Sequence, residues 1–368
     1  MKKTQVFILG AGCSYDGDKG YPLAKQFVPA LEAYARRLDT EQDCKLIRDD
    51  VQMTARLLRE CQGGTLHANT LDQLVDLILR GQCDHFLAKL SKSDVHARRY
   101  RAVTGAKIAT AALFRDLENV VLPRQVEKYR TFIQRKVFHG SGISDRSRSR
   151  LRASTARVLS FNYDRLFELT FRASFMDSEL RGFAPYSQEA LNSGVDMFGQ
   201  VCGIAPDRFC FLKMHGSVGM RCGTDFSGQS EILQGLDFMD PAYRKVSDAE
   251  FFPSGPQVAR LPEPLIAFPY EKDYILRGKE NALAFRSYIE TVWVHAKTVL
   301  AEASEIWIIG YSFDPTDCGY LIALLKGIGK NCERIVIQNL TAECDRLENL
   351  LKMDYGIAMR TEKCPFGF

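Results

Sequence analysis

The sequence predicts an α/β protein: a parallel sheet with helices on both faces, plus a large, mainly helical insertion. Short apolar runs alternate with helical patterns along most of the chain, and several of these runs end in glycine or polar residues. This alternation is typical of parallel sheets, because each strand needs a crossover helix before the next can lie beside it. We expect a core from residues 1–38 and 151–368 and a helical insertion from residues 39–150.

The first strand is expected at Val6–Leu9, an apolar run followed by Gly10-Ala11-Gly12-Cys13-Ser14. Glycines after a buried strand let main-chain N–H groups approach a phosphate, and a following helix N-terminus adds its dipole. Tyr15 occupies the position of the third glycine in the dinucleotide fingerprint, so the match to an ordinary dehydrogenase is incomplete.

The insertion is predicted from apolar stripes at helical spacing throughout the stretch from Asp39 to Phe138. Pro22 fits the first turn of a preceding helix. The glycine-containing segment Tyr15–Tyr21 before it could close over a ligand, or could be a solvated connection. The stripes consist of Leu71, Leu74, Val75, Ile78 and Leu79, and of Ile108, Ala111, Ala112 and Leu113.

The rest of the core is expected to alternate strand and helix, whereas residues 218–264 have little periodicity and indicate a surface excursion. The expected strands are Val158–Ser160, Phe209–Met214, Leu265–Phe268, Ile306–Ile309 and Arg334–Asn339. The expected helices are Leu166–Phe175, Asn281–Ala303, Leu321–Ile328 and Ala342–Met353.

Composition indicates a soluble, cytoplasmic protein. The net charge of +4 on 368 residues does not by itself predict nucleic-acid binding. The eleven cysteines form no C-x-x-C pair and are expected to be reduced. No apolar run has the length of a signal peptide or of a membrane helix.

Polar segments follow several predicted strands. They are Gly10–Ser14, Asn162-Tyr163-Asp164, His215-Gly216-Ser217, Gly310-Tyr311-Ser312 and the terminal Asn339. Because ligands bind at the carboxyl ends of strands in open α/β sheets, we expect these segments to converge on one site.

In this order the motifs resemble those of the sirtuin-like family, also called the silent information regulator family, over residues 1–38 and about 151–340. The resemblance implies a Rossmann-like NAD-binding core. It implies that Gly10, Ala11, Gly12 and Ser14 line the NAD phosphates and ribose, and that Gly310, Ser312 and Asn339 hold the adenosine half. Asn162 and Asp164 would sit at the nicotinamide ribose, and His215 would be the general base. Cys13, Pro22, Leu23, Gly216 and Tyr311 complete the expected NAD-binding set.

Two departures separate the chain from the deacylases of that family. It lacks their four-cysteine zinc module, so no metal is expected, and it lacks the Asp-Phe-Arg that follows their proline. The pattern looks more like the zinc-free sirtuin-like NADases of bacterial anti-phage defence, which hydrolyse NAD+ to nicotinamide and ADP-ribose. That resemblance implies a homo-oligomer and a possible partner such as a HerA-like ATPase.

Other interpretations stay open. The chain could be a catalytically silent nucleotide-binding sensor or scaffold of a defence complex, or an NAD-dependent deacylase. Asn162 and Asp164 could simply cap a helix, and His215 could be a core residue. The alternating arginines Arg146, Arg148, Arg150 and Arg152 could grip nucleic acid, but an exposed loop is favoured, and neither nucleic acid nor a membrane is expected as a ligand.

Overall fold

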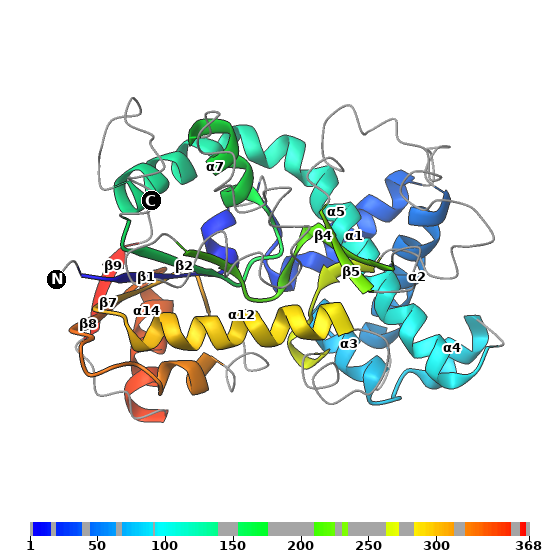
Figure 1. The fold of residues 1–368 in the computed structure, drawn as a ribbon. Coiled ribbons are helices and arrows are strands. Elements are labelled where there is room, and N and C mark those ends of the chain that lie inside the picture. The colour runs from blue at the N-terminus through cyan, green and yellow to red at the C-terminus, as the bar shows by residue number, and fades with distance from the viewer. Residues whose placement is uncertain are drawn as a thin grey trace. The chain divides into compact units, whose positions relative to one another are not determined.

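The computed structural model describes residues 3–15, 20–38, 45–63, 68–90, 93–138, 154–175, 210–224, 230–234, 263–271, 283–312, 321–354 and 361–365. The chain, drawn as a ribbon in Figure 1, divides into two compact units. Unit 1 comprises Met1–Tyr15, Val121–His215 and Ser287–Phe368. Unit 2 comprises Asp16–Val120 and Gly216–Arg286.

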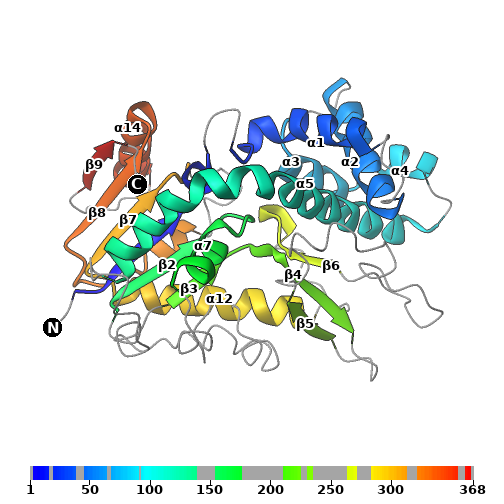
Figure 2. The same cartoon turned by 90° about the horizontal axis from the view of Figure 1, so that it is seen from above.

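Unit 1 is built on a six-stranded sheet of order β3-β2-β1-β7-β8-β9, in which every neighbouring pair is parallel (Figure 2). Counted within this sheet, the order is 3-2-1-4-5-6, the order of a doubly wound dinucleotide-binding fold. This confirms the predicted α/β, Rossmann-like class. The strands are β1 (Gln5–Leu9), β2 (Ala156–Ser160), β3 (Cys210–Lys213), β7 (Glu305–Ile309), β8 (Arg334–Asn339) and β9 (Thr361–Pro365).

Helices cover both faces of this sheet, with α7 and the end of α5 (Val95–Phe132) on one side and α12 and α14 on the other (Figure 1). Aromatic contacts attach the first layer: the ring of Phe7 lies 5.2 Å from Phe132 of α5, and Phe211 stacks 4.5 Å from Phe167 of α7. The elements are α7 (Leu166–Phe175), α12 (Leu283–Ala301), α14 (Thr341–Asn349) and the π-helical turns Ile133–Val137 and Leu350–Asp354.

The predicted helical insertion between β1 and β2 is also confirmed. Gly105 faces a second helix of the insertion: a Cβ added there would lie 2.4 Å from the end of the flexible Met53 side chain. Among the described helices, none combines the length and apolar character needed to cross a bilayer. The helices are α1 (Ala24–Leu38), α2 (Lys45–Gly63), α3 (Leu71–Leu79), α4 (Asp84–Leu90) and α5 (Val95–Phe132), of which α5 continues from unit 2 into unit 1.

Unit 2 also holds a small antiparallel sheet of order β5-β4-β6. Its strands are β4 (Gly216–Thr224), β5 (Ser230–Gln234) and β6 (Glu263–Ile266). Most of β4 and all of β5 fall in the stretch 218–264 that was expected to be a surface excursion without regular structure, so residues 218–224 and 230–234 correct that expectation. β4 contains three glycines and a register shift, which together obscure the alternating pattern that identifies a strand.

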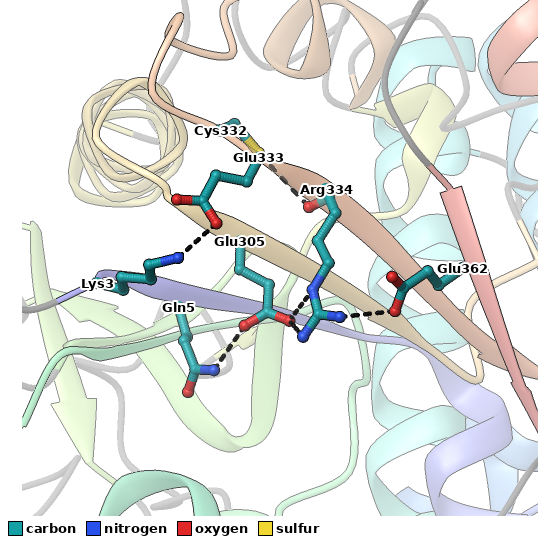
Figure 3. Close-up of polar contacts among 7 residues, drawn as sticks. All are labelled: Lys3, Gln5, Glu305, Cys332, Glu333, Arg334 and Glu362. Carbon is teal, nitrogen blue, oxygen red and sulfur yellow. Dashed lines mark hydrogen bonds and ion pairs between the residues drawn. The ribbon is translucent and has the colours of Figure 1, made fainter.

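A charged ladder crosses the N-terminal edge of the parallel sheet (Figure 3). Glu305 of β7 accepts a hydrogen bond from the Gln5 amide on β1 at 2.7 Å and one from the Arg334 guanidinium on β8, also at 2.7 Å. Arg334 reaches on to Glu362 of β9 at 2.7 Å. The register pairs Gln5 with Glu305 and Glu305 with Arg334, and Glu362 lies opposite Val336, two positions after Arg334. The ladder therefore links four strands at the end of the sheet where they begin.

The short edge strand β9, which the sequence did not predict, is also attached to α14. The Glu348 carboxylate accepts hydrogen bonds from Lys352 and Lys363, each at 2.6 Å, and from Thr361 at 2.5 Å. These three donors lower the pKa of Glu348 from 4.5 to about 2.

We expect Glu348→Gln to reduce the acid sensitivity of the fold. Because the folded pKa is depressed, the carboxylate stabilises the fold above pH 4.5 and loses this effect as pH falls towards 2. The site is near the surface, so the contribution is about 0.2–1 kcal/mol. Urea denaturation at pH 6 and pH 3 measures it, with Lys363→Met removing one donor as a second test. Equal loss of stability on acidification in wild type and Glu348→Gln would contradict the assignment.

Candidate functional site

The point where strand order reverses lies between β1 and β7. From β1 the chain adds β2 and β3 on one side, then returns to β7 on the other side and adds β8 and β9. The turns Gly10–Ser14 and Gly310–Ser312 follow the carboxyl ends of these two central strands. In open α/β sheets this is where ligands bind, so the fold puts two predicted motifs at the expected place.

The glycines of these turns allow the two turns to approach each other closely. An added Cβ on Gly10 would lie 2.3 Å from the Tyr311 Cα, and one on Gly12 would lie 2.7 Å from the Gly310 carbonyl oxygen. Gly310 has a φ of 58°, which disfavours any side chain. The Gly12 N–H donates to the Gly310 carbonyl at 2.8 Å, and the Gly10 N–H to the Ile309 carbonyl at 3.0 Å. These N–H groups, expected to reach a phosphate, here join one turn to the other.

Neighbouring side chains fix the same turns. The Cys13 thiol is buried and donates to the Ile309 carbonyl at 3.0 Å, and burial raises its pKa. The Asn339 Nδ2 donates to the Tyr311 carbonyl at 3.2 Å. Arg346 of α14 donates to the Ser312 carbonyl. Asn339 therefore supports the turn after β7 from the end of the adjacent strand. Of the predicted residues in the two turns, Ala11 and Ser312 are exposed to solvent.

A buried polar cluster lies beside the β1 turn and consists of Ser14, Tyr129, Asn162 and Asp164. The Ser14 hydroxyl lies 2.7 Å from the Tyr129 hydroxyl and donates to the Asp164 Oδ2 at 2.8 Å. It also accepts from the Asn162 Nδ2 at 3.4 Å. The Asn162 Oδ1 is buried and has no hydrogen-bond partner among the described residues. The structure thus brings three predicted site residues together around one hydroxyl.

Asp164 has a second role, because its Oδ1 accepts from the Leu166 N–H at 3.0 Å and caps the start of α7. Asp164 therefore both caps the helix and belongs to the polar cluster. Lys213 of β3 donates to the Asp164 carbonyl and lies 3.1 Å from the Glu168 carboxylate, with both side chains 1% exposed. This buried ion pair ties α7 and its cap to the sheet.

His215 follows β3 and is 3% exposed. Its ring meets Phe161 edge to face at a centroid distance of 5.1 Å, and Tyr163 lies 5.8 Å away. Phe161 also lies 4.7 Å from the Tyr311 ring, and its N–H donates to the Leu9 carbonyl at 2.9 Å. Phe161 therefore connects the ends of β1 and β2, the turn after β7 and the histidine.

Three of the predicted NAD-binding residues, Pro22, Leu23 and Gly216, belong to unit 2, and the others belong to unit 1. Gly216 has a φ of 73°, and a Cβ there would lie 1.8 Å from the Leu265 carbonyl oxygen, so pairing of β4 with β6 requires this glycine. Asp16–Lys19 of the proposed closing segment and the arginines at 146–152 lie outside the described residues. In the described parts of the chain, no three His, Cys, Asp or Glu side chains are grouped to hold a metal ion.

Sequence reasoning missed Tyr129, Lys213, Glu168 and Phe161. Tyr129 lies on α5, within the stretch assigned to the insertion, and is 115 positions from Ser14. Burial and the nearby Asp164 charge raise its pKa well above 10. Lys213 and Glu168 lie in otherwise apolar segments, and only their contact across the fold explains why charges are tolerated there.

We expect Gly310→Ala to destabilise the protein by about 1–3 kcal/mol, because the new Cβ would lie 2.4 Å from the Cys13 nitrogen at a positive φ. Gly327→Ala is the matched control, since its Cβ would meet a single carbonyl oxygen at 3.2 Å. Chemical denaturation compares the two variants. A loss for Gly310→Ala no larger than that for Gly327→Ala would show that close turn packing is unimportant.

Lys213→Met should lower the free energy of unfolding by about 3–5 kcal/mol, because it removes the amine that pairs with buried Glu168. The double variant Lys213→Met/Glu168→Gln should recover part of this loss, since no carboxylate is then left without its amine. Thermal and urea denaturation of the single and double variants provide the test. A double variant at least as unstable as Lys213→Met would rule out charge pairing as the cause.

Comparison of the chain with protein-family models, with curated proteins and with solved structures finds no match in any of the three. The candidate site therefore rests on the strand order, the packing of the two turns and the polar cluster described above.

Proposed function

We propose that the chain is an NAD+ hydrolase that cleaves the bond between nicotinamide and ribose to give nicotinamide and ADP-ribose. The motif resemblance suggests this reaction, and the strand order supports binding of a dinucleotide at the turns after β1 and β7. The same resemblance extends the proposal to NAD+ depletion in anti-phage defence by a homo-oligomer.

The observation that carries the proposal is the unpartnered Oδ1 of Asn162. A buried amide oxygen without a hydrogen bond costs free energy, about 1–3 kcal/mol, unless a ligand or water donates to it. It lies in the cluster that includes Ser14 of the β1 turn, and Asn162 directly follows Phe161, which packs on His215. A ribose hydroxyl or an attacking water is a donor of the required kind.

The chemistry suits these groups. As the C–N bond breaks, nicotinamide takes both bonding electrons and leaves neutral, while positive charge develops on the anomeric carbon. Water then forms the new C–O bond and loses a proton, which a neutral histidine at position 215 can accept. The Asn162 Oδ1 can orient the reacting hydroxyl or water without adding charge.

The test is to incubate purified protein with NAD+ and measure nicotinamide release. We expect His215→Ala and Asn162→Ala each to reduce the rate by about 10²–10⁴-fold, as is typical when a general base is lost. His96→Ala, which changes an exposed residue of α5, is the matched control and should retain wild-type activity. Chelators should leave the rate unchanged. Wild-type turnover in a folded His215→Ala or Asn162→Ala variant would remove that residue from the mechanism.

Binding measurements separate the alternatives. Tight binding of ADP-ribose without nicotinamide release would indicate a nucleotide-binding sensor or scaffold. Nicotinamide release only in the presence of an acyl-lysine peptide would indicate a deacylase. If the protein neither binds ADP-ribose nor releases nicotinamide, the proposed function is refuted.

A further inference from the structure

We propose that Tyr129 is a positioning residue for this site: through the Ser14 hydroxyl it fixes the orientation of the Asn162 amide. This inference rests on the proposed function for its kinetic consequence, but the hydrogen-bond arrangement itself does not. Tyr129 comes from α5 and not from a strand end, so it lies outside the motifs that carry the resemblance.

The hydrogen-bonding capacity of Ser14 limits how its three neighbours can be arranged. A serine hydroxyl has one proton to donate and two lone pairs that accept. The proton goes to the Asp164 Oδ2 at 2.8 Å, because a carboxylate oxygen can only accept. The Tyr129 hydroxyl, at 2.7 Å, must therefore donate to Ser14. The second lone pair faces the Asn162 Nδ2 at 3.4 Å, so all three positions around Ser14 are filled.

These three hydrogen bonds to the Ser14 hydroxyl determine which end of the Asn162 amide faces it. The two ends of an asparagine amide have nearly the same shape and differ only in donating or accepting. If the amide were reversed, its oxygen would face a hydroxyl whose proton is already held by Asp164, and two acceptors would oppose each other. The Nδ2 therefore points to Ser14, and the Oδ1 remains available to accept from a bound ligand.

Tyr129 is suited to hold this arrangement because its position and its protonation are both fixed. The side chain is 1% exposed, and its ring meets Phe167 of α7 edge to face at 6.5 Å. Burial and the charge of Asp164 raise the pKa of Tyr129 well above 10, so the phenol remains a donor at neutral pH. Without this donor, the Ser14 Oγ loses one of the three hydrogen bonds that hold it, so the oxygen can shift and its 3.4 Å contact with the Asn162 Nδ2 is weakened.

The test is Tyr129→Phe, which removes only the hydroxyl. We expect kcat for NAD+ cleavage to fall about 10–100-fold, the scale of small misplacements in active sites, with a smaller change in KM. Ser14→Ala should have a similar effect, and the double variant should be no worse than Ser14→Ala alone, because both act through one hydroxyl. Phe171→Leu is the matched control: Phe171 is a buried ring of α7 that stacks on Phe167 at 6.1 Å, so the variant should lower stability and leave kcat unchanged.

A second measurement does not depend on catalysis. In protein labelled with ¹⁵N-asparagine, the side-chain amide of Asn162, identified by its absence in Asn162→Asp, should exchange its protons with water faster in Tyr129→Phe than in wild type or Phe171→Leu. If wild type cleaves NAD+ and Tyr129→Phe is equally active, the proposal for Tyr129 is overturned while the proposed function stands. If wild type does not cleave NAD+, the proposed function fails, and the exchange rate decides: faster exchange supports the orienting role and unchanged exchange refutes it.

Discussion

The close contact between the turns after β1 and β7 is the constraint on which the candidate site depends. Two parallel strands lie side by side in register, and the chain leaves each of them through a glycine turn at the same edge. The turns meet backbone to backbone, with the Gly12 N–H donating to the Gly310 carbonyl at 2.8 Å. Side chains on Gly10, Gly12 or Gly310 would collide with the opposite turn. Because the η1 turn (Ala11–Ser14) is held in this way, Ser14 points its hydroxyl at the end of β2.

Ser14 in turn positions the residues that would contact a substrate. The hydroxyl is shared by side chains from α5 and from the loop after β2, and Asp164 in turn caps α7. A buried polar network is stable when its members are satisfied. Within this cluster the Asn162 Oδ1 is left without a partner, beside Ser14 of the turn that follows the central strand β1. Such exceptions call for an explanation, and ligand binding at this edge of the sheet supplies one.

The polar groups at the two ends of the parallel strands differ in burial and in their effect on stability. At the N-terminal edge, the ladder from Gln5 through Glu305 and Arg334 to Glu362 links four strands with charged groups that are partly exposed (Figure 3). At the carboxyl edge, the polar groups are buried and lie on turns. Charge pairing near the surface contributes modestly to stability, whereas a buried group such as Lys213 is costly to disturb. Variants such as Lys213→Met should therefore cost more stability than variants in the ladder.

The amino-acid sequence alone determined the fold class, because alternation of apolar strands with helical patterns is a local property of the chain. It placed β8 at Arg334–Asn339 and α7 at Leu166–Phe175, and the structure has both with the same bounds. It predicted a strand at Leu265–Phe268 that overlaps β6, but it did not predict β4, β5 or β9, since a short edge strand and a glycine-rich strand have no clear periodicity. It also could not reveal Tyr129, whose helical surroundings resemble those of any buried aromatic residue. Only the tertiary structure brings that hydroxyl to Ser14 across 115 positions of sequence, because hydrogen bonds between distant segments depend on how α5 packs on the sheet.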